Sequence, residues 1–234
     1  MLGLVGVTIG TQAMKKNNPL IRLVGAVVIA AAFPVLTAAA ATNAAPVVTE
    51  EEESAWSFSA YAYTYLQEGD RDYVQPIFTA DRGWLHLEAR YNYEDYETFS
   101  FWVGYNWSFG EDIAVTLTPM VGGAVGETKG VAPGFRLNAE WWKLTLYSEG
   151  EYFFDADESD DDFFYNWSEL NLDLTHGFRA GLVIQKETSE DVRRGFSVGY
   201  TWEIEKLGEL DLVAYFFDLD KANEMYVLAI GLNF

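Results

Sequence analysis

The sequence predicts an all-β protein, a transmembrane antiparallel up-and-down β-barrel of about twelve strands. Three observations support this fold class. Segments of about ten residues alternate between apolar and polar side chains, the period of a strand with one lipid face and one wet face. Aromatic residues make up 16% of the chain, which suits a protein with interfacial girdles. Mean hydropathy is −0.04, too low for a bundle of transmembrane helices but compatible with alternating strands.

The last segment, residues 225–234, shows this alternation most clearly. An unpaired strand of this kind would expose an apolar edge that promotes aggregation, so we expect it to pair with the first strand and close a barrel. Its bulky residues share one parity and face lipid in this interpretation: Tyr226, Leu228, Ile230, Leu232 and Phe234.

Eleven further segments have similar length and are separated by turn residues. Tight turns alternate along the chain with mostly longer, more polar loops, and an even strand count places both ends of the barrel on the periplasmic side. We expect strands over residues 56–65, 75–80, 84–94, 98–109, 113–126, 131–142, 143–154, 163–175, 178–187, 194–204, 209–218 and 225–234.

Residues 1–41 have the pattern of a secretory signal peptide. The basic residues Lys15, Lys16 and Arg22 precede an apolar run over residues 23–36, and small residues follow it. The run is shorter than the roughly 20 residues that a spanning helix needs, which argues against a membrane anchor.

Translation from Met14 rather than from Met1 would give this signal peptide a more typical start. After cleavage, residues 42–55 are expected to form a short, acidic, disordered periplasmic segment. The barrel itself is expected to occupy residues 56–234.

Charge and composition exclude several classes of function. A formal net charge of −21 argues against a nucleic-acid partner, because phosphates would be repelled. The chain has no cysteine, so neither disulfides nor a thiolate site are available. His86 and His176 are the only histidines, and neither has a metal-ligand spacing or a serine partner that we can place. We therefore expect no enzyme, no metal site and no cofactor.

Alternation within the strands predicts which side chains face the lumen. In the predicted strand at residues 84–94, the apolar side chains occupy alternate positions, among them Leu85, Ala89 and Tyr93, and we assign them to the lipid face. The facing of the first strand stays open, because its tyrosines suit either side. The candidates for the lumen are His86, Glu88, Arg90, Trp102, Arg136, Asn138, Glu140, Glu149, Glu151, Glu169, Asp173, Arg179, Glu203 and Asp211.

The tight turns also predict approximate partners across each hairpin. Arg136, Glu149 and Glu169 should form one row at mid-height. Because two carboxylates side by side repel each other, a proton, a cation or a further basic residue is needed there. Arg90, which should stack on Trp102, is the best candidate to reach across.

A second cluster is expected near the periplasmic end. Arg179 should lie among the three carboxylates of Asp173, Glu203 and Asp211. Two interpretations stay open for both clusters: a packed ionic network that fills a small barrel, or an acidic constriction that favours cations and solutes with amino or hydroxyl groups.

The segment from residue 56 to Phe234 resembles the outer-membrane β-barrels of Gram-negative bacteria, in particular small barrels of about twelve strands that act as monomeric channels. The resemblance implies an outer-membrane location after export through the periplasm, contact with lipid and lipopolysaccharide, and Tyr226 and Phe234 as a signal for the barrel assembly machinery. Acidic-sugar porins and nucleoside channels belong to this class. No family-specific motif is present, and acidic-sugar porins have lumens that look basic, whereas this one should be acidic.

Function is therefore predicted as a narrow passive channel for small solutes, with an acidic, weakly cation-preferring lumen. Twelve strands lie between the filled eight-stranded barrels and the open porins, so a narrow pore is expected. The alternative is a non-conducting structural or surface-binding barrel whose lumen charges are all paired. In that case the acidic loop at residues 155–162 could bind divalent cations next to lipopolysaccharide.

Overall fold

The computed structural model describes residues 55–67, 69–157, 161–188, 190–220 and 224–234. The predicted signal peptide at residues 1–41 and nearly all of the predicted acidic segment at 42–55 lie outside the described residues. Among the residues that are described, no helix is long and apolar enough to cross a membrane.

The described residues form thirteen strand segments, in close agreement with the predicted ranges. Every pairing between them is antiparallel. The segments are β1 (Ser57–Gln67), β2 (Tyr73–Arg82), β3 (Leu85–Tyr91), β4 (Phe99–Tyr105), β5 (Trp107–Phe109), β6 (Ala114–Val125), β7 (Gly130–Trp141), β8 (Leu144–Asp155), β9 (Phe163–Asp173), β10 (Phe178–Glu187), β11 (Arg193–Ile204), β12 (Gly208–Phe217) and β13 (Met225–Asn233).

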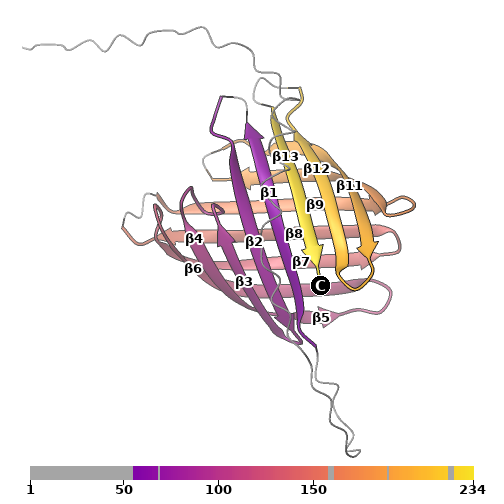
Figure 1. Ribbon diagram of the computed structural model, residues 1–234. Helices are drawn as coiled ribbons and strands as arrows, with labels where there is room; N and C mark the ends of the chain where they lie inside the picture. The colour runs from indigo at the N-terminus through magenta and orange to yellow at the C-terminus, as the bar shows by residue number, and fades with distance from the viewer. Residues whose placement is uncertain (1–54, 68, 158–160, 189, 221–223) are drawn as a thin grey trace, which may run out of the picture. The chain divides into compact units, whose positions relative to one another are not determined.

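β4 and β5 are two parts of one barrel strand that is interrupted at Asn106. Both pair with β6 in one continuous register, since Gly104 lies opposite Met120 and Trp107 opposite Leu117. The barrel of the described residues therefore has twelve strands, each next to its neighbours in sequence, and β1 pairs with β13 to close it. Figure 1 shows β1 and β2 beside β13 and β12 on the near wall, crossing the strands of the far wall. The predicted fold class and strand number are confirmed.

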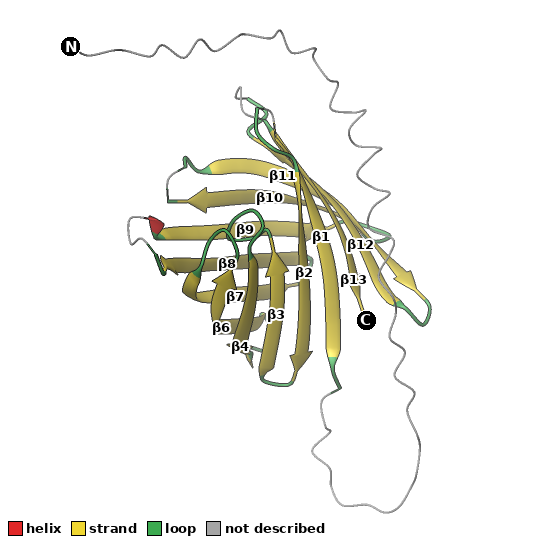
Figure 2. Cartoon of the chain, turned by 60° about the vertical axis from the view of Figure 1, so that its left-hand side comes forward, coloured by secondary structure: helices red, strands yellow, loops and turns green. Residues whose placement is uncertain are grey.

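Two ends of the barrel can be distinguished by their connections. The turn end carries Phe58, Phe234 and short connections of two to four residues at 83–84, 110–113, 142–143, 174–177 and 205–207. The loop end carries the connections at 68–72, 92–98, 126–129, 156–162, 188–192 and 218–224. Figure 2 shows the hairpins β2–β3 and β3–β4 with their connections at opposite ends of the barrel wall.

The seam between β1 and β13 is held at the turn end by the last residue. The Phe58 N–H donates to the Phe234 carbonyl at 2.8 Å, and the Phe234 N–H donates back to Phe58 at 2.9 Å. Their rings stack with centroids 5.7 Å apart. Further along the seam, Tyr61 lies over Gly231, where a Cβ would come within 2.1 Å of the tyrosine ring. Tyr61 can therefore face the lumen only because its neighbour is glycine.

The outer surface is apolar, as a lipid-facing wall requires. Large hydrophobic side chains such as Phe101, Val121 and Leu182 are exposed on it. Six of the eight tryptophans are also exposed, and all six belong to the turn end, where they form an interfacial girdle. They are Trp56, Trp84, Trp107, Trp141, Trp142 and Trp202.

The predicted strand at residues 84–94 is too long, and this changes one assignment. β3 ends at Tyr91 because Asn92 adopts a left-handed conformation with φ of 56°, and the chain turns. Tyr93 was assigned to the lipid face by alternation, and this is wrong: beyond the turn the alternation no longer applies, and its hydroxyl bonds to Glu149 inside the barrel. The structure also settles which way the first strand faces. Tyr61, Tyr63 and Tyr65 all lie on the lumen side.

Substitution of Phe234 tests whether closure of the barrel between β1 and β13 depends on this residue. We expect Phe234→Ala to lower the yield of folded barrel in an outer-membrane fraction, because it removes the ring that stacks on Phe58 at the seam. Folded protein can be measured by its heat-modifiable migration on gels. Phe109→Ala is the matched control, since Phe109 is also an exposed phenylalanine at the turn end but away from the seam. Equal yields of the two variants would contradict a special role for Phe234.

Candidate functional site

A cavity of about 860 Å³ occupies the turn half of the barrel interior. It is lined by inward-facing side chains from the turn halves of the strands, and its walls are acidic. Its arginines are Arg136 and Arg179, and His86 also lines it. Against these two arginines stand eight carboxylates: Asp81, Glu88, Glu140, Glu149, Glu169, Asp173, Glu209 and Asp211.

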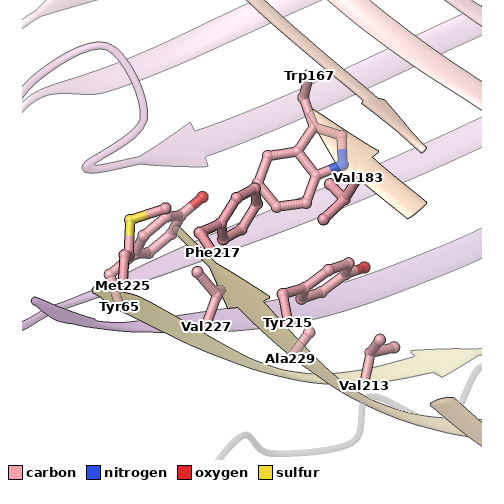
Figure 3. Close-up of a cluster of buried hydrophobic side chains, with 9 residues drawn as sticks. All are labelled: Tyr65, Trp167, Val183, Val213, Tyr215, Phe217, Met225, Val227 and Ala229. Carbon is pink, nitrogen blue, oxygen red and sulfur yellow. The ribbon is translucent and has the colours of Figure 1, made fainter. Parts of the chain in front are cut away.

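The loop half of the interior is packed with side chains instead. One apolar cluster lies against the seam and is shown in Figure 3, where Trp167 of β9 reaches toward Phe217 and Tyr215 of β12. Its members are Tyr65, Trp167, Val183, Val213, Tyr215, Phe217, Met225, Val227 and Ala229. A second apolar cluster lies on the opposite side and contains Trp102, Met120, Ala124, Ala132 and Phe153.

Burial confirms that these side chains leave little space. Phe217 has no exposed surface, and Trp102 and Phe153 are each 1% exposed although they point toward the barrel axis. None of the three lines the cavity. Within the described residues the lumen is therefore open in its turn half and filled in its loop half.

Arg90 lies at the boundary between the two halves. Its Nε donates to Glu88 Oε1 at 2.8 Å and its Nη1 donates to Glu151 Oε2 at 2.9 Å. The guanidinium carbon is 4.0 Å from the ring centroid of Tyr93 and 4.5 Å from that of Trp102. The predicted stacking on Trp102 is confirmed, but the partners are Glu88 and Glu151 rather than the predicted mid-height row.

His86 joins this network on the cavity side. Its Nδ1 lies 2.8 Å from Asp81 Oδ1 and its Nε2 lies 3.2 Å from Glu88 Oε2. Arg136 Nη1 is also 3.4 Å from Nε2. β2 continues to Arg82 and so places Asp81 opposite His86.

Glu149 receives hydrogen bonds from two neutral hydroxyls. Tyr93 donates to Oε1 at 2.7 Å and Tyr147 donates to Oε2 at 2.6 Å. Arg136 lies opposite Glu149 in the sheet, as predicted, but its Nε bonds to the Tyr147 hydroxyl at 3.1 Å. Within the described part of the chain, no arginine or lysine forms an ion pair with Glu149. Its carboxyl group lines the cavity.

The predicted row of Arg136, Glu149 and Glu169 is displaced by two residues. Glu149 lies opposite Trp167, and Glu169 lies opposite Tyr147. The reason is that pairing between β8 and β9 begins with Phe153 and Phe163, so the last two residues of β8 extend past the hairpin. Both carboxylates nevertheless line the same cavity.

The second predicted cluster is smaller than expected. Arg179 makes two hydrogen bonds to Asp211, each of 2.7 Å, and one to Thr201 Oγ1 at 2.9 Å. Asp173 lies opposite Arg179 as predicted. Glu203 does not, because Gly199 occupies that position and leaves room for the guanidinium.

The predicted lumen residues fall into three groups. Arg90, Trp102 and Glu151 are buried on the loop side of the cavity. Glu203 is exposed and faces Glu209 at the turn end, outside the residues that line the cavity. The other ten line the cavity: His86, Glu88, Arg136, Asn138, Glu140, Glu149, Glu169, Asp173, Arg179 and Asp211.

Several site residues were not predicted. Asp81 and Tyr147 follow the parity of their neighbours Thr79 and Glu149, so strict alternation through the strand ends would have found them. Asn106 interrupts a strand, and its Nδ2 bonds to Asp81 Oδ1 at 2.7 Å. No local pattern marks Tyr93.

No group of three potential metal ligands is present among the described residues. Residues 158–160 of the acidic loop at 155–162 lie outside the described residues. Tyr226, assigned with Phe234 to an assembly signal, has the parity of the outer face of β13.

No protein-family model matches the sequence, and comparison with curated proteins finds no match. Solved structures are similar in fold. The KdgM porin covers 75% of this chain over 99% of its own, with a TM-score of 0.49 at 10% identity. The KdgM porin in complex with disordered oligogalacturonate has the same coverage, with a TM-score of 0.50 at 11% identity. The outer membrane protein opdK from Pseudomonas aeruginosa covers 73% of this chain over 60% of its own, with a TM-score of 0.41 at 9% identity.

At these identities the likeness concerns the fold. The closed antiparallel barrel, its apolar outer face and its tryptophan girdle agree with that likeness. The protein has a porin-like fold, a closed antiparallel β-barrel with an apolar outer face.

Removal of Arg90 should strongly destabilise the barrel. Arg90→Met would leave Glu151 buried without its cation and Glu88 with only the longer arginine contact, to Arg136 at 3.5 Å, which costs about 3–5 kcal/mol. The exposed Arg82 provides the control, since Arg82→Met should change stability by less than about 1 kcal/mol. The free energy of unfolding in urea, measured in lipid vesicles, compares them. Similar values for both variants would show that Arg90 does not hold the network.

Two adjacent glycines test the packing of Trp102. A Cβ on Gly122 would lie 2.3 Å from the Trp102 ring, whereas a Cβ on Gly123 would meet nothing closer than 3.7 Å. Overpacking costs about 1–3 kcal/mol, so Gly122→Ala should lower the free energy of unfolding by that amount and Gly123→Ala should not. A destabilised Gly123→Ala with an unaffected Gly122→Ala would contradict this packing.

Proposed function

We propose that this barrel is a narrow channel for small solutes that prefers cations and amines. The observation that carries the proposal is the composition of the cavity wall, eight carboxylates against two arginines. Both arginines bond to carboxylates or to a tyrosine, so the excess of negative charge stays. A cavity with one sign of charge and low-dielectric walls concentrates ions of the opposite sign.

Glu149 and Glu169 are the carboxylates best placed to act on a passing cation. Both line the cavity at mid-height, where it ends against the packed half. Neither forms an ion pair with an arginine or lysine of the described residues. A unit charge about 6 Å from one ionised carboxylate, at an effective dielectric constant of about 20, interacts with it by about 3 kcal/mol before screening.

Tyrosines give the wall a second kind of contact. Tyr61, Tyr63, Tyr147 and Tyr215 all line the cavity, and the first two stack with centroids 6.0 Å apart. Phenol hydroxyls bond to hydroxylated solutes and ring faces attract ammonium groups, so amino and hydroxyl compounds suit this lining. An oligogalacturonate, present in the KdgM porin complex, would instead be repelled by the carboxylates.

In the membrane we place the turn end on the periplasmic side, following the rule of short periplasmic turns. The cavity then opens toward the periplasm and the loop end meets lipopolysaccharide. Assembly through the barrel assembly machinery, with Tyr226 and Phe234 as its signal, is part of the same proposal.

A non-conducting barrel is the alternative, and one observation favours it. The side chains of the loop half are buried and packed. In that case the cavity would be a closed vestibule, and charge-neutralising changes in it would alter stability without altering permeability.

Neutralisation of two carboxylates tests the selectivity. In planar bilayers under a salt gradient, the reversal potential of wild type should show cation preference, and Glu149→Gln with Glu169→Gln should lower the cation-to-anion permeability ratio at least about twofold, because two nearby charges are lost. Glu111→Gln with Glu127→Gln removes the same charge from exposed positions outside the cavity and serves as control.

An unchanged ratio in the Glu149 and Glu169 variant would contradict the proposed role of these carboxylates. Absence of conductance at every voltage in folded wild-type protein would favour the closed barrel instead.

A further inference from the structure

The connection between β3 and β4, residues 92–98, bends over the loop end and is fixed there by several contacts. The Asn92 amide donates to the Val74 carbonyl at 2.8 Å and accepts the Glu97 N–H at 2.8 Å. Tyr96 packs edge-on against Tyr73, with ring centroids 5.1 Å apart. The outer part of the segment is thus attached to β2, while its second residue, Tyr93, points inward.

Tyr93 crosses from this connection to the opposite wall. Its hydroxyl donates to Glu149 of β8 at 2.7 Å, and its ring meets Tyr165 of β9 edge-on at 5.4 Å. Its face covers the Arg90 guanidinium. It is therefore the one side chain of the described connection that links β3 to both β8 and β9 through the lumen.

The cavity ends where Tyr93 stands. Glu149 lines the cavity, but Tyr93, Arg90 and Glu151 do not. Among the described residues, four buried polar atoms have no hydrogen-bond partner in the protein. Three of them, Arg90 Nη2, Glu94 Oε2 and Glu151 Oε1, lie on the loop side of Tyr93, and the fourth, Gln185 Oε1, lies on β10. Buried polar atoms of this kind require water, so this layer is suited to hydration.

The seam side of the loop half offers no such layer. The cluster of Figure 3 contains Val183, Phe217 and Val227, whose side chains carry no polar atom and are at most 1% exposed. A polar solute that passes Glu149 toward the loop end meets the charged groups of Arg90, Glu94 and Glu151 on the side of β3 and β8.

We propose that Tyr93 is the gate of an off-centre permeation route, which runs from the cavity past Glu149 and along Arg90, Glu94 and Glu151 to the loop end. The inference rests on the proposed channel function. Tyr93 closes the route by its bond to Glu149 and its stacking on Arg90.

Opening exposes a free carboxylate. When the Tyr93 hydroxyl leaves Glu149 Oε1, the Tyr147 bond to Oε2 stays and Glu149 faces the route with one free oxygen. A cation or ammonium group that enters from the cavity replaces the lost hydrogen bond. The gate therefore opens more readily for cations than for anions, and it acts on the selectivity as well as on the current.

Single-channel recording of the full chain tests this gate. A hydrogen bond to a charged acceptor and a cation–π contact hold the closed state, so Tyr93→Ala should raise the mean current at least about tenfold. Tyr93→Phe keeps the ring and should raise it less. Phe217→Ala removes a comparable volume from the apolar cluster on the seam side and should leave the current unchanged, and heat-modifiable migration verifies that each variant is folded.

The outcomes separate the gate from the channel. Conducting wild type with an unchanged Tyr93→Ala current would overturn the gate and leave the channel function in place. No current in wild type or in Tyr93→Ala would overturn both. An equal rise in Phe217→Ala would show that any loosening of the loop half opens the barrel, which contradicts a specific route.

A thiol at the same position gives a second measurement. The chain has no cysteine, so Tyr93→Cys carries a single reactive group. A cationic methanethiosulfonate reagent should react with it and reduce the current, since the added group lies in the route. Reaction without any change in current would place Tyr93 outside the route and overturn the proposal.

Discussion

The arrangement of side chains inside this barrel depends on the contacts of one buried arginine, Arg90. A buried guanidinium is tolerated only where carboxylates and other partners replace the water it has lost. Arg90 has both kinds of partner. Its guanidinium bonds to the carboxylates of Glu88 and Glu151 and contacts the rings of Tyr93 and Trp102. Glu88 lines the open cavity and Glu151 belongs to the packed layer, so the same residue joins the two halves of the lumen.

The walls of the lumen are consequently unlike each other. β12, β13 and β1 contribute an apolar surface in the loop half, and the last strand carries no charge on its lumen side. β3, β7 and β8 contribute the charged network. In the loop half, the apolar surface at the seam and the charged network therefore belong to different strands. A solute path on the side of β3 and β8 is the consequence that we have proposed.

Local patterns were sufficient for the fold but not for the site. Alternation with period two fixes strand positions, and short turns fixed pairs such as Arg136 with Glu149. The loop at 156–162 produced an error of two residues and the loop at 188–192 an error of four, because loop length does not determine which residues begin a hairpin. The bond from Arg90 to Glu151 joins residues 61 positions apart, and depends on the curvature of the closed barrel. Tyr93 was misplaced because a left-handed Asn92 ends the strand before it.

An acidic lumen should select solutes by charge, and liposome swelling measures this selectivity most directly. Glucosamine, glucose and glucuronate are similar in size but differ in charge. With this protein reconstituted into liposomes, we predict that swelling rates fall in the order glucosamine, glucose, glucuronate, since the cavity wall holds eight carboxylates and two arginines. Equal rates for the three sugars, or fastest entry of glucuronate, would contradict the account.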